Sequence, residues 1–493
     1  MTFTRSASPF KTVSEIHDGF DKKAISPVEL VQDFLIAAKA SKLNAFITLN
    51  QDQAIEQAKA AEKILNQEGR VPRSKMPLLG IPIGIKDILA TDGLRTTCAS
   101  KILENYIPPY TATSVKRLES AGAITLGKLN MDEFAMGGSN ENSAFGPVLH
   151  PTHPNRVPGG SSGASAAVVR SGVCVASLGT DTGGSIRLPA SYCGIVGLKP
   201  TYGRVSRFGQ IAFASSLDQI GPMASTVEDM AILLDVLSGH DPLDSTSTLR
   251  PATQAVQALK RAPEWKNIKI GIPKEYLVDG LALDVGNAVQ ESMRWFESKG
   301  AKLVPISLPH TPYAVAVYYV VAVSEASSNL ARFDGVRFGT RPPATQSAAN
   351  LAEFYEAVRS NFGSEVKRRI ILGTFALSSG YSDAYYKKAC QVRRLIRQDF
   401  DQAFEKVDFI MGPVSPTTAY KLGEKSTDPL KMYLNDIFTI PVNLAGLPGM
   451  SVPCGEDSDG LPIGLHLIGP AFGEEELTSV ANAFFSEFRK GRM

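Results

Sequence analysis

Residues 173–187 read VCVASLGTDTGGSIR, and this stretch joins a buried-strand pattern to a tight glycine loop that contains a serine. The apolar run 173–178 is typical of a strand buried on both faces of a sheet. The loop 179–187 then presents Ser185 beside backbone N–H groups. Such groups can hold the oxyanion of an acyl-transfer intermediate, or they can cradle a phosphate.

Similar apolar runs recur along the chain, separated by helical patterns and Gly-rich loops. This alternation predicts an α/β fold with a central mixed β-sheet covered by helices on both faces. The other runs are 81–85, 123–126, 268–272 and 409–411, and strand-like runs return between 440 and 470.

The 493 residues show no internal repeat and no low-complexity linker, which favours a single domain over residues 1–493. Within this domain we expect an N-terminal helical segment over about 1–65 and a core over about 78–225. A helical insertion is expected over about 312–404.

Local patterns also predict individual helices. Ser26-Pro27-Val28-Glu29 indicates a helix start, because Ser26 can cap, Pro27 suits the first turn and Glu29 completes a capping box. The Ala-rich stretch 54–65 and the charged stretch 387–404 also favour helix.

Two further segments carry unusual chemistry. Gly84-Ile85-Lys86-Asp87 ends an apolar run with a lysine, and taken alone Lys86 is most simply a strand-end residue that reaches solvent. Residues 158–165 read PGGSSGAS and lead into a helix-like run. Taken alone they form a flexible turn with a capping serine, although such a turn also exposes N–H groups and hydroxyls at the positive end of the helix.

Two other kinds of site compete for these loops. A phosphate site is disfavoured, because the chain contains neither GxxxxGK[ST] nor GxGxxG. Residues 159–163 do spell GxSxG, the nucleophile elbow of Ser-His-Asp hydrolases, but that elbow requires a strand directly before it. Residues 153–158 read as a loop, so a Ser-His-Asp triad is disfavoured. The downstream histidines, none in a suitable loop, are His240, His310 and His466.

Lys86, the GGSSG around Ser161 and the Gly-Gly-Ser loop at Ser185, in this order and spacing, resemble the amidase signature family. The resemblance extends over nearly the whole chain and implies the amidase-signature fold and a Ser-Ser-Lys site that cuts carboxamides. It assigns Ser185 as the nucleophile, Ser161 as the bridge and Lys86 as the base. It also implies an oxyanion hole of backbone N–H groups from Thr182, Gly183, Gly184 and Ser185.

Three stretches outside these loops resemble the glutamine-hydrolysing A subunits of tRNA-dependent amidotransferases: 324–335, 377–381 and 436–443. The resemblance implies hydrolysis of glutamine to glutamate and ammonia, with the ammonia converting mischarged Glu-tRNA(Gln) to Gln-tRNA(Gln). It also implies a heterotrimer. The B subunit of such an assembly would hold the tRNA and use ATP and magnesium, and the small C subunit would clamp the other two together, so no cofactor or metal is expected on this chain.

The same resemblance implies charged contacts for the two α-groups of glutamine. Arg369 would bind the α-carboxylate and Asp436 the α-amine, with Tyr319 lining the pocket. From the residues alone, Arg369 can also belong to a solvated helix face, and Asp436 can cap the element that follows. The alternative function is a free-standing amidase that acts on another carboxamide, since an apolar amide would need neither charge. A non-catalytic binding protein is disfavoured, because Lys86, Ser161 and Ser185 are all present.

Lys86 must be neutral to act as a base. Its usual pKa is about 10.4, so work near neutral pH needs a drop of roughly 3, which burial must supply at about 4 kcal/mol. The apolar run before Lys86 offers the means. Asp87 opposes this drop unless its carboxylate faces elsewhere.

Two other features of the site region have open interpretations. Asp181 and Arg187 flank the nucleophile loop and can form a structural ion pair. Residues 136–143 read MGGSNENS and either shape the site or its exit or form an ordinary surface loop.

Net charge, cysteine count and hydropathy indicate which partners and which cellular compartment to expect. With 51 basic and 49 acidic residues the net charge is +2, which disfavours strong nucleic-acid binding by this chain alone. The five cysteines form no CxxC pair, and we expect them to be small core residues. The first ten residues lack a signal-peptide pattern and no long apolar run occurs, so the expected location is the cytoplasm.

Overall fold

The computed structural model describes residues 10–67, 73–276, 280–424 and 432–490, and within these ranges eleven strands form one mixed sheet. Strands β2, β3 and β4 are parallel to one another, as are β7, β8 and β9, whereas the remaining neighbours pair antiparallel. The order across the sheet is β1-β3-β2-β4-β6-β5-β10-β11-β9-β7-β8. The bounds are β1 Phe46–Leu49, β2 Pro82–Lys86, β3 Ile124–Leu129, β4 Ala176–Asp181, β5 Val196–Lys199, β6 Gln219–Ala224, β7 Lys269–Pro273, β8 Lys302–Ile306, β9 Phe409–Pro413, β10 Gly449–Glu456 and β11 Pro462–Ile468.

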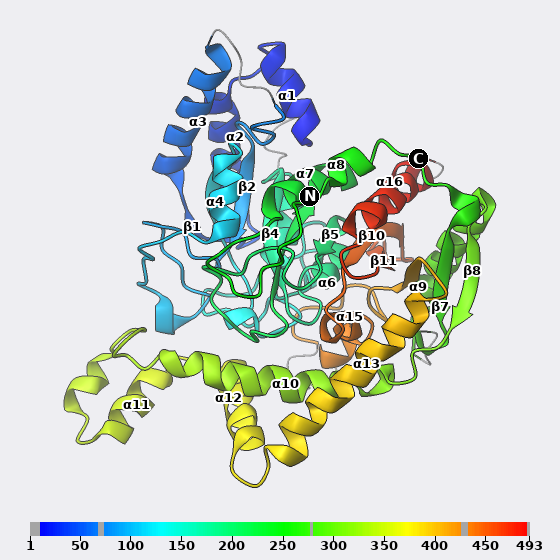
Figure 1. Ribbon diagram of the computed structural model, residues 1–493. Helices are drawn as coiled ribbons and strands as arrows, with labels where there is room; N and C mark the ends of the chain where they lie inside the picture. Colours follow the sequence, from blue (N-terminus) through cyan, green and yellow to red (C-terminus); the bar gives the residue numbers. More distant parts are fainter. Residues whose placement is uncertain (1–9, 68–72, 277–279, 425–431, 491–493) are drawn as a thin grey trace.

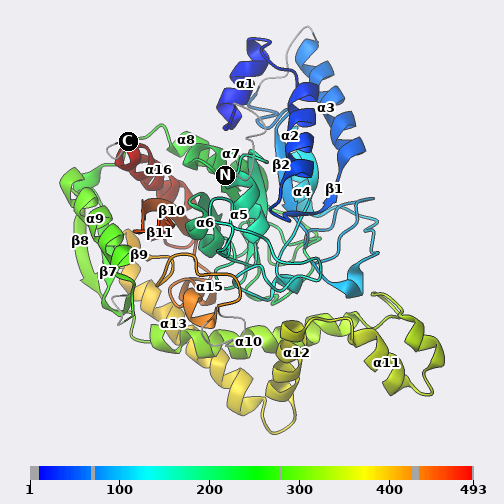
Figure 2. The same cartoon turned by 180° about the vertical axis from the view of Figure 1, so that it is seen from behind.

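Helices lie on both sides of the strands, as Figures 1 and 2 show, so the predicted α/β architecture is confirmed. Residues 1–9, most of the stretch without a signal-peptide pattern, lie outside the described ranges. The helices are α1 Val13–Asp21, α2 Pro27–Ala40, α3 Gln51–Asn66, α4 Thr113–Ser120, α5 Gly163–Arg170, α6 Arg187–Cys193, α7 Val227–Leu237, α8 Ala255–Ala258, α9 Leu283–Lys299, α10 Ala314–Asn329, α11 Leu351–Arg359, α12 Ser364–Leu377, α13 Lys388–Phe404, α15 Ile440–Leu444 and α16 Glu474–Lys490.

The N-terminal segment begins as its sequence predicts. Ser26 Oγ accepts a hydrogen bond from Glu29 N (3.2 Å), and Glu29 Oε2 accepts one from Ser26 N (2.8 Å), so the capping box of α2 is confirmed. The purely helical interpretation of this segment is wrong at one point, since Phe46–Leu49 forms β1. That strand is fixed by antiparallel pairing with β3, a distant contact that a local pattern does not reveal.

Several strand boundaries differ from the sequence-based expectation; residues 173–175, for example, precede β4, which begins at Ala176. The apolar run 173–178 predicts a strand that ends before the glycine loop, whereas β4 continues to Asp181 because Thr180 and Asp181 pair with Ile220 and Gln219 of β6. The start of the expected 440–470 strand region is wrong, since Ile440–Leu444 forms the short helix α15. Pro441 suits the first turn of a helix, and an apolar run buried on all sides carries no period that separates helix from strand.

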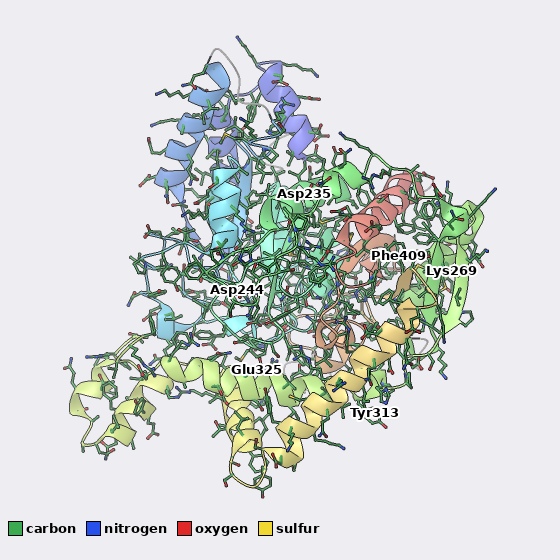
Figure 3. The ribbon with its side chains drawn as sticks, in the orientation of Figure 1. Asp235, Asp244, Lys269, Tyr313, Glu325 and Phe409 are labelled. Atoms are coloured by element: carbon green, nitrogen blue, oxygen red, sulfur yellow. The ribbon has the colours of Figure 1, made fainter. Side chains whose placement is uncertain are left out.

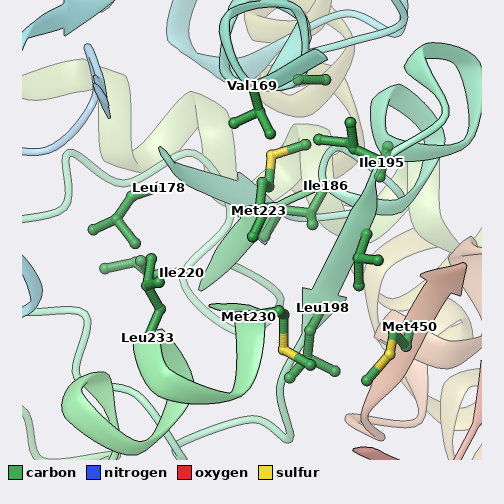
Figure 4. Close-up of a cluster of buried hydrophobic side chains, with 14 of the residues drawn as sticks. Val169, Leu178, Ile186, Ile195, Leu198, Ile220, Met223, Met230, Leu233 and Met450 are labelled. Carbon is green, nitrogen blue, oxygen red and sulfur yellow. The ribbon is translucent and has the colours of Figure 1, made fainter. Parts of the chain in front are cut away.

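The nucleophile loop is anchored in the apolar core at both ends. Figure 4 shows Leu178 of β4 and Ile186, the residue after Ser185, within one cluster that also contains Met223 of β6 and Leu198 of β5. All four side chains are buried. Close packing of this kind holds its members in place, so the loop between Leu178 and Ile186 is set by the core and not by solvent.

The region 312–404 folds as helices α10 to α13, which run along the lower edge of the molecule in Figure 1. Glu325 of α10, labelled in Figure 3, ties this layer to the core, because its carboxylate accepts from Ser216 N (2.8 Å) and Ser216 Oγ (2.6 Å). The stretch Thr311–Arg332 is 22 residues long with mean hydropathy 1.2, enough by length and composition alone to cross a membrane. Half of it is buried inside the protein, however, and α10 packs against α12, α13 and α15, as a core helix does.

Candidate active site

Lys86 ends β2 in the interior of the sheet, flanked by the parallel strands β3 and β4. Its side chain is completely buried, so the interpretation as a solvent-reaching lysine is wrong. Lys86 Nζ lies 2.7 Å from Ser161 Oγ, 2.8 Å from Ser162 Oγ and 2.8 Å from Thr180 Oγ1. The structure therefore brings the predicted lysine and Ser161 together, in a cage of three hydroxyl groups.

The partners of these hydroxyls restrict where the protons go. Ser162 Oγ donates to Thr180 O (3.1 Å), so it has no second proton to give to the amine. A neutral Lys86 has two N–H donors and one lone pair, and one of its three neighbours must donate to that lone pair. Ser161 and Thr180 are the two that can, which makes Ser161 a chemically competent proton partner for Lys86.

Burial sets the charge of Lys86. Removal from water lowers its pKa to about 7, against the raising effect of Asp132, Asp181 and Asp218. A lowering of that size corresponds to about 5 kcal/mol. Lys86 is thus poised between its two charge states at neutral pH, as a general base needs.

Asp87, next to Lys86 in the chain, faces away from it. Asp87 Oδ2 accepts from Thr97 N (2.8 Å) and Thr97 Oγ1 (2.5 Å), and Asp87 Oδ1 lies 3.5 Å from Lys128 Nζ. Asp87 and Lys128 are both fully buried and form their own ion pair. The Asp87 carboxylate thus faces elsewhere, and this direction removes the expected opposition of Asp87 to the lowering of the Lys86 pKa.

The loop that carries Ser161 is shaped by the polar segment 136–143. Asp132 N donates to Ser161 O (3.3 Å), and the Asp132 carboxylate accepts from Asn140 N (2.9 Å) and Asn142 N (3.0 Å). A Cβ atom on Gly160 would lie 2.1 Å from Asp132 Oδ2, so only glycine fits there. Ser139 and Asn140 are buried, and the interpretation of this segment as an ordinary surface loop is wrong.

Ser185 lies at the open side of the site. It is 8% exposed, whereas Lys86 and Ser161 are both at 0%. Ser162 N donates to Ser185 O (3.2 Å), which places the two serine loops in backbone contact. Among the described residues the Ser185 hydroxyl has no hydrogen-bond partner, and no bond joins it to Ser161. Of the three residues, Ser185 is the one that a substrate can reach.

The loop before Ser185 keeps its backbone donors free. No described residue accepts a hydrogen bond from the N–H groups of residues 182–185, although other atoms of the loop are firmly held. Thr182 Oγ1 donates to Asp218 Oδ1 (2.8 Å), and Thr439 Oγ1 donates to Gly183 O (2.7 Å). Free N–H groups on a fixed loop are what an oxyanion hole requires. The four donors are those of Thr182, Gly183, Gly184 and Ser185.

Asp181 and Arg187 form the structural ion pair that their flanking positions predict. Arg187 Nη2 donates to Asp181 Oδ1 and Arg187 Nε to Asp181 Oδ2, both at 3.0 Å, with both side chains fully buried. The guanidinium holds the pKa of Asp181 near 2 despite its burial. Asp181 Oδ2 also accepts from Ile186 N (3.1 Å), so the pair fixes the turn that contains Ser185.

Arg369 lies on the inner face of α12 and is 2% exposed, so the solvated-face interpretation is wrong. Arg369 Nε donates to Glu365 Oε1 (2.8 Å), and Tyr433 OH donates to the same oxygen (2.9 Å). The guanidinium also lies 5.2 Å from the Tyr319 ring centre and 5.6 Å from those of Tyr433 and Phe213. Because Nε alone is engaged by the described residues, the outer N–H groups can form the two-point contact that a carboxylate prefers.

Asp436 lies directly beside the nucleophile loop. A Cβ atom on Gly184 would be 2.4 Å from Asp436 Oδ1, so the carboxylate touches the loop itself. Thr439 Oγ1, which donates to Gly183 O, lies 3.4 Å from Asp436 Oδ1, and among the described residues no side chain caps the helix α15 that follows. Burial raises the pKa of Asp436 to about 8, with Asp181 adding to the rise. A positively charged amine bound here would favour the ionised carboxylate.

The two tyrosines of α10 divide between these groups. Tyr319, the predicted pocket residue, stacks on Tyr433 with ring centres 3.8 Å apart, next to Arg369. Tyr318 instead faces the nucleophile loop, since a Cβ atom on Gly183 would lie 2.8 Å from the Tyr318 ring. Tyr318 is therefore the tyrosine that contacts the nucleophile loop, and the sequence offers no signal that separates it from Tyr319.

Several functional neighbours escape sequence reasoning. Ser162 stands beside Ser161 in the quoted motif, but its contact with Lys86 follows only from the three-dimensional loop. Thr180 reaches Lys86 because β4 lies parallel to β2 in the sheet. Asp132 and Asp218 come from segments without any motif and contact the two serine loops.

The rival triad finds no support. Among the described residues no histidine bonds to Ser161 or Ser185, since His466 meets Arg187 (3.1 Å) and His310 meets Asp399 (2.8 Å). The residues just before Ser161 form a loop and no strand. The five cysteines form no disulfide, and all but Cys390 are buried, as small core residues are expected to be.

The family model for amidases matches residues 29–478. The chain therefore belongs to the amidase family, which confirms the resemblance of its three motifs. It is 54% identical over 477 residues to the A subunit of glutamyl-tRNA(Gln) amidotransferase from Geobacter metallireducens, with 96% of each chain covered. It is 57% identical over 476 residues to the same protein of Geobacillus thermodenitrificans, again with 96% of each chain covered.

Solved structures agree with this assignment. The crystal structure of the A subunit of glutamyl-tRNA(Gln) amidotransferase from Thermotoga maritima is 40% identical and superposes with a TM-score of 0.77, covering 97% of this chain and 94% of that one. The native peptide amidase of Stenotrophomonas maltophilia is 27% identical, with a TM-score of 0.80 and coverage of 98% and 97%. The fold is thus shared by amidases that differ widely in sequence.

Proposed function

We propose that this chain is the glutamine-hydrolysing subunit of a tRNA-dependent amidotransferase that converts Glu-tRNA(Gln) to Gln-tRNA(Gln). The names of relatives more than half identical to it support this function. The structural observation that carries it is a carboxylate, Asp436, against the nucleophile loop, with the charge of the buried cation Arg369 acting on it. Arg369 and Asp436 match the α-carboxylate and α-amine of glutamine, which a simple apolar amide lacks.

In the proposed reaction Ser185 is the nucleophile, Ser161 the bridge and Lys86 the base. Neutral Lys86 takes the proton of Ser161 while Ser161 takes that of Ser185, and Ser185 Oγ attacks the side-chain amide carbon. The carbonyl oxygen becomes an oxyanion that accepts hydrogen bonds from the free N–H groups of the loop. When the C–N bond breaks, the same relay returns the proton to nitrogen and ammonia leaves.

Water completes the cycle. The ester between Ser185 and the glutamyl group is attacked by a water molecule whose proton passes through Ser161 to Lys86. Breakage of the ester bond releases glutamate and returns the proton to Ser185 Oγ. In each step the proton moves between the two serine hydroxyls and the Lys86 amine. The relay therefore provides both activation of the nucleophile and protonation of the leaving group.

The rest of the assembly is proposed on the same basis. The relatives are named as one subunit of an amidotransferase, so we place this chain in a heterotrimer with the B and C subunits of that enzyme, in the cytoplasm. ATP and magnesium then belong to the B subunit, which activates the tRNA-bound glutamate. The released ammonia is the nitrogen source for that partner.

The test is ammonia release from glutamine by the chain alone and by the chain co-expressed with its B and C subunits. Release should rise sharply when the partners, ATP and Glu-tRNA(Gln) are present, and Ser185→Ala should abolish it. Hydrolysis of other amides by the chain alone, without any response to the partners, would contradict the proposal and indicate a free-standing amidase.

A variant at the carboxylate contact separates these two functions further. Arg369→Ala should raise KM for glutamine by about a hundredfold, the cost of one buried ionic contact of roughly 3 kcal/mol. The same variant should leave the hydrolysis of an amide without an α-carboxylate little changed. An unchanged KM for glutamine would remove Arg369 from the substrate site.

A further inference from the structure

Glu133 is a buried acid that the proposed reaction does not use. It follows Asp132, the residue whose N–H donates to Ser161 O, and it is only 4% exposed. One carboxylate oxygen accepts from the Ser100 hydroxyl, and the other accepts from Gly363 N (2.8 Å). A buried carboxylate is costly unless it is paired or hydrogen-bonded, and these two contacts offset that cost.

The contact with Gly363 lies at the start of α12. Gly363 is the N-cap residue of this helix and offers no side chain to cap it, so Glu133 supplies a carboxylate from outside the helix. Negative charge is favourable at a helix N-terminus because it meets free N–H groups and the positive end of the dipole. A Cβ atom on Gly363 would lie 2.3 Å from Glu133 Oε2, which explains the glycine.

Aromatic packing secures the same junction. Phe134, the residue after Glu133, is fully buried, and its ring centre lies 5.6 Å from that of Phe362 and 5.0 Å from that of Phe333. Phe362 directly precedes Gly363. Residues 132–134 therefore connect the Ser161 loop on one side with the first turn of α12 on the other.

The position of α12 decides where Arg369 stands. The one hydrogen bond of the Arg369 side chain among the described residues goes to Glu365 of the same helix. The place of the guanidinium relative to Ser185 therefore depends on how α12 is held against the core. We propose that Glu133 is a positioning residue that fixes the start of α12 to the Ser161 loop and so sets Arg369 at the distance that the α-carboxylate of glutamine requires.

This inference rests on the proposed glutamine hydrolysis, and its test uses two substrates of the assembled enzyme. One is glutamine, and the other is 4-aminobutanamide, which keeps the amide and the amine but lacks the α-carboxylate. Glu133→Ala should raise KM for glutamine about tenfold with kcat changed less than about threefold, since about 1.4 kcal/mol of ground-state binding is lost. Its kcat/KM for 4-aminobutanamide should stay within about threefold of the wild-type value.

A conservative variant and a matched control exclude a general loss of structure. Glu133→Gln keeps an oxygen that can accept from Gly363 N, so it should retain most of the wild-type KM. Asp229→Ala removes an equivalent contact elsewhere, because Asp229 is buried and accepts from Val13 N at the start of α1 (3.1 Å). Asp229→Ala should lower stability and leave KM for glutamine unchanged.

The outcomes separate the two proposals. A wild-type enzyme that releases no ammonia from glutamine would overturn the proposed function. A wild type that hydrolyses glutamine, with Glu133→Ala losing activity on both substrates equally, would overturn the positioning role. An unchanged KM for glutamine in Glu133→Ala would overturn it as well.

Discussion

The amine of Lys86 is surrounded by three hydroxyl groups, and no carboxylate in the described part of the chain contacts it directly. These neighbours would allow Lys86 to serve as the proposed base at neutral pH. A carboxylate in contact would stabilise the ammonium form, whereas hydroxyls satisfy either charge state and leave burial as the dominant effect. Asp132, Asp181 and Asp218 act from further away and limit how far the pKa falls.

The first prediction concerns pH. Because Lys86 works only when neutral and Asp436 binds the amine when ionised, kcat/KM for glutamine should rise as pH increases through about 7 to about 8 and then level off. Asp132 and Asp218 have pKa values of about 6, so they are already ionised where Lys86 loses its proton. Rates measured from about pH 5.5 to about pH 9 give the curve directly. Lys86→Met should cost roughly a thousandfold or more in kcat, and a flat wild-type profile would contradict the role of Lys86.

The second prediction concerns the neighbouring ion pair. Asp87→Asn leaves the Lys128 ammonium buried without its partner, and loss of one member of such a pair typically costs about 3–5 kcal/mol. Thermal and urea unfolding should therefore show a clear loss of stability. Adding Lys128→Met should recover part of it. The pH midpoint of activity should stay in place, and a displaced midpoint would mean that the charge of Asp87 reaches Lys86 after all.

Single residues were predictable from the sequence where the chemistry requires a particular residue type at a particular spacing. Lys86, Ser161 and Ser185 stand out by their Gly-rich surroundings alone. The direction of Asp87 and the contact of Ser162 with Lys86 were not predictable, because each depends on a side-chain rotation or a loop path. The placement of Tyr318 against the nucleophile loop and of Tyr319 beside Arg369 has the same origin, since neighbours on a helix point about 100° apart.

At the scale of secondary structure, the site is built where elements end. Lys86 ends β2, Ser161 precedes α5, and Ser185 lies between β4 and α6. The apolar strands were readable because strands buried on both faces form continuous apolar runs. Strand β6 could not be predicted in this way, since it contains Gly221 and Pro222 and owes its position to pairing with β4.

The third prediction tests the close packing of the nucleophile loop. Gly184→Ala would place a methyl group 2.4 Å from Asp436 Oδ1 and 2.5 Å from Thr439 Oγ1, so the loop or Asp436 must move. We expect kcat/KM for glutamine to fall by about a hundredfold or more, as misplacement by about 1 Å commonly does.

Gly138→Ala is the matched control for this variant. A Cβ atom there would meet nothing closer than 3.7 Å, with Asp436 Oδ2 again among its neighbours. Its activity should stay close to that of the wild type. Full activity in Gly184→Ala would show that the free N–H groups of this loop do not need their present positions.

At the scale of the whole molecule, the site joins parts of the chain that are far apart. Ser185 belongs to the core, Arg369 to the helical insertion and Asp436 to the segment that precedes α15. No local pattern predicts that these segments come together, and only the resemblance to a family assigned Arg369 and Asp436 to one substrate site. Long-range packing of α10 against α12 and α15 brings the elements together.

The last prediction follows from the charge of the whole chain. Affinity for tRNA comes largely from phosphate contacts with lysine and arginine, and a net charge of +2 over 493 residues leaves little excess for them. The isolated chain should therefore bind Glu-tRNA(Gln) no more tightly than about 10 μM near about 150 mM salt, in the range of non-specific binding. The heterotrimer with the B and C subunits should bind far more tightly, and filter binding at several salt concentrations compares the two. Ser185→Ala should bind like the wild type in both states, because the nucleophile takes no part in holding the tRNA. Tight binding by the isolated chain, with a steep dependence on salt, would move tRNA recognition onto this chain and contradict the proposed division of labour.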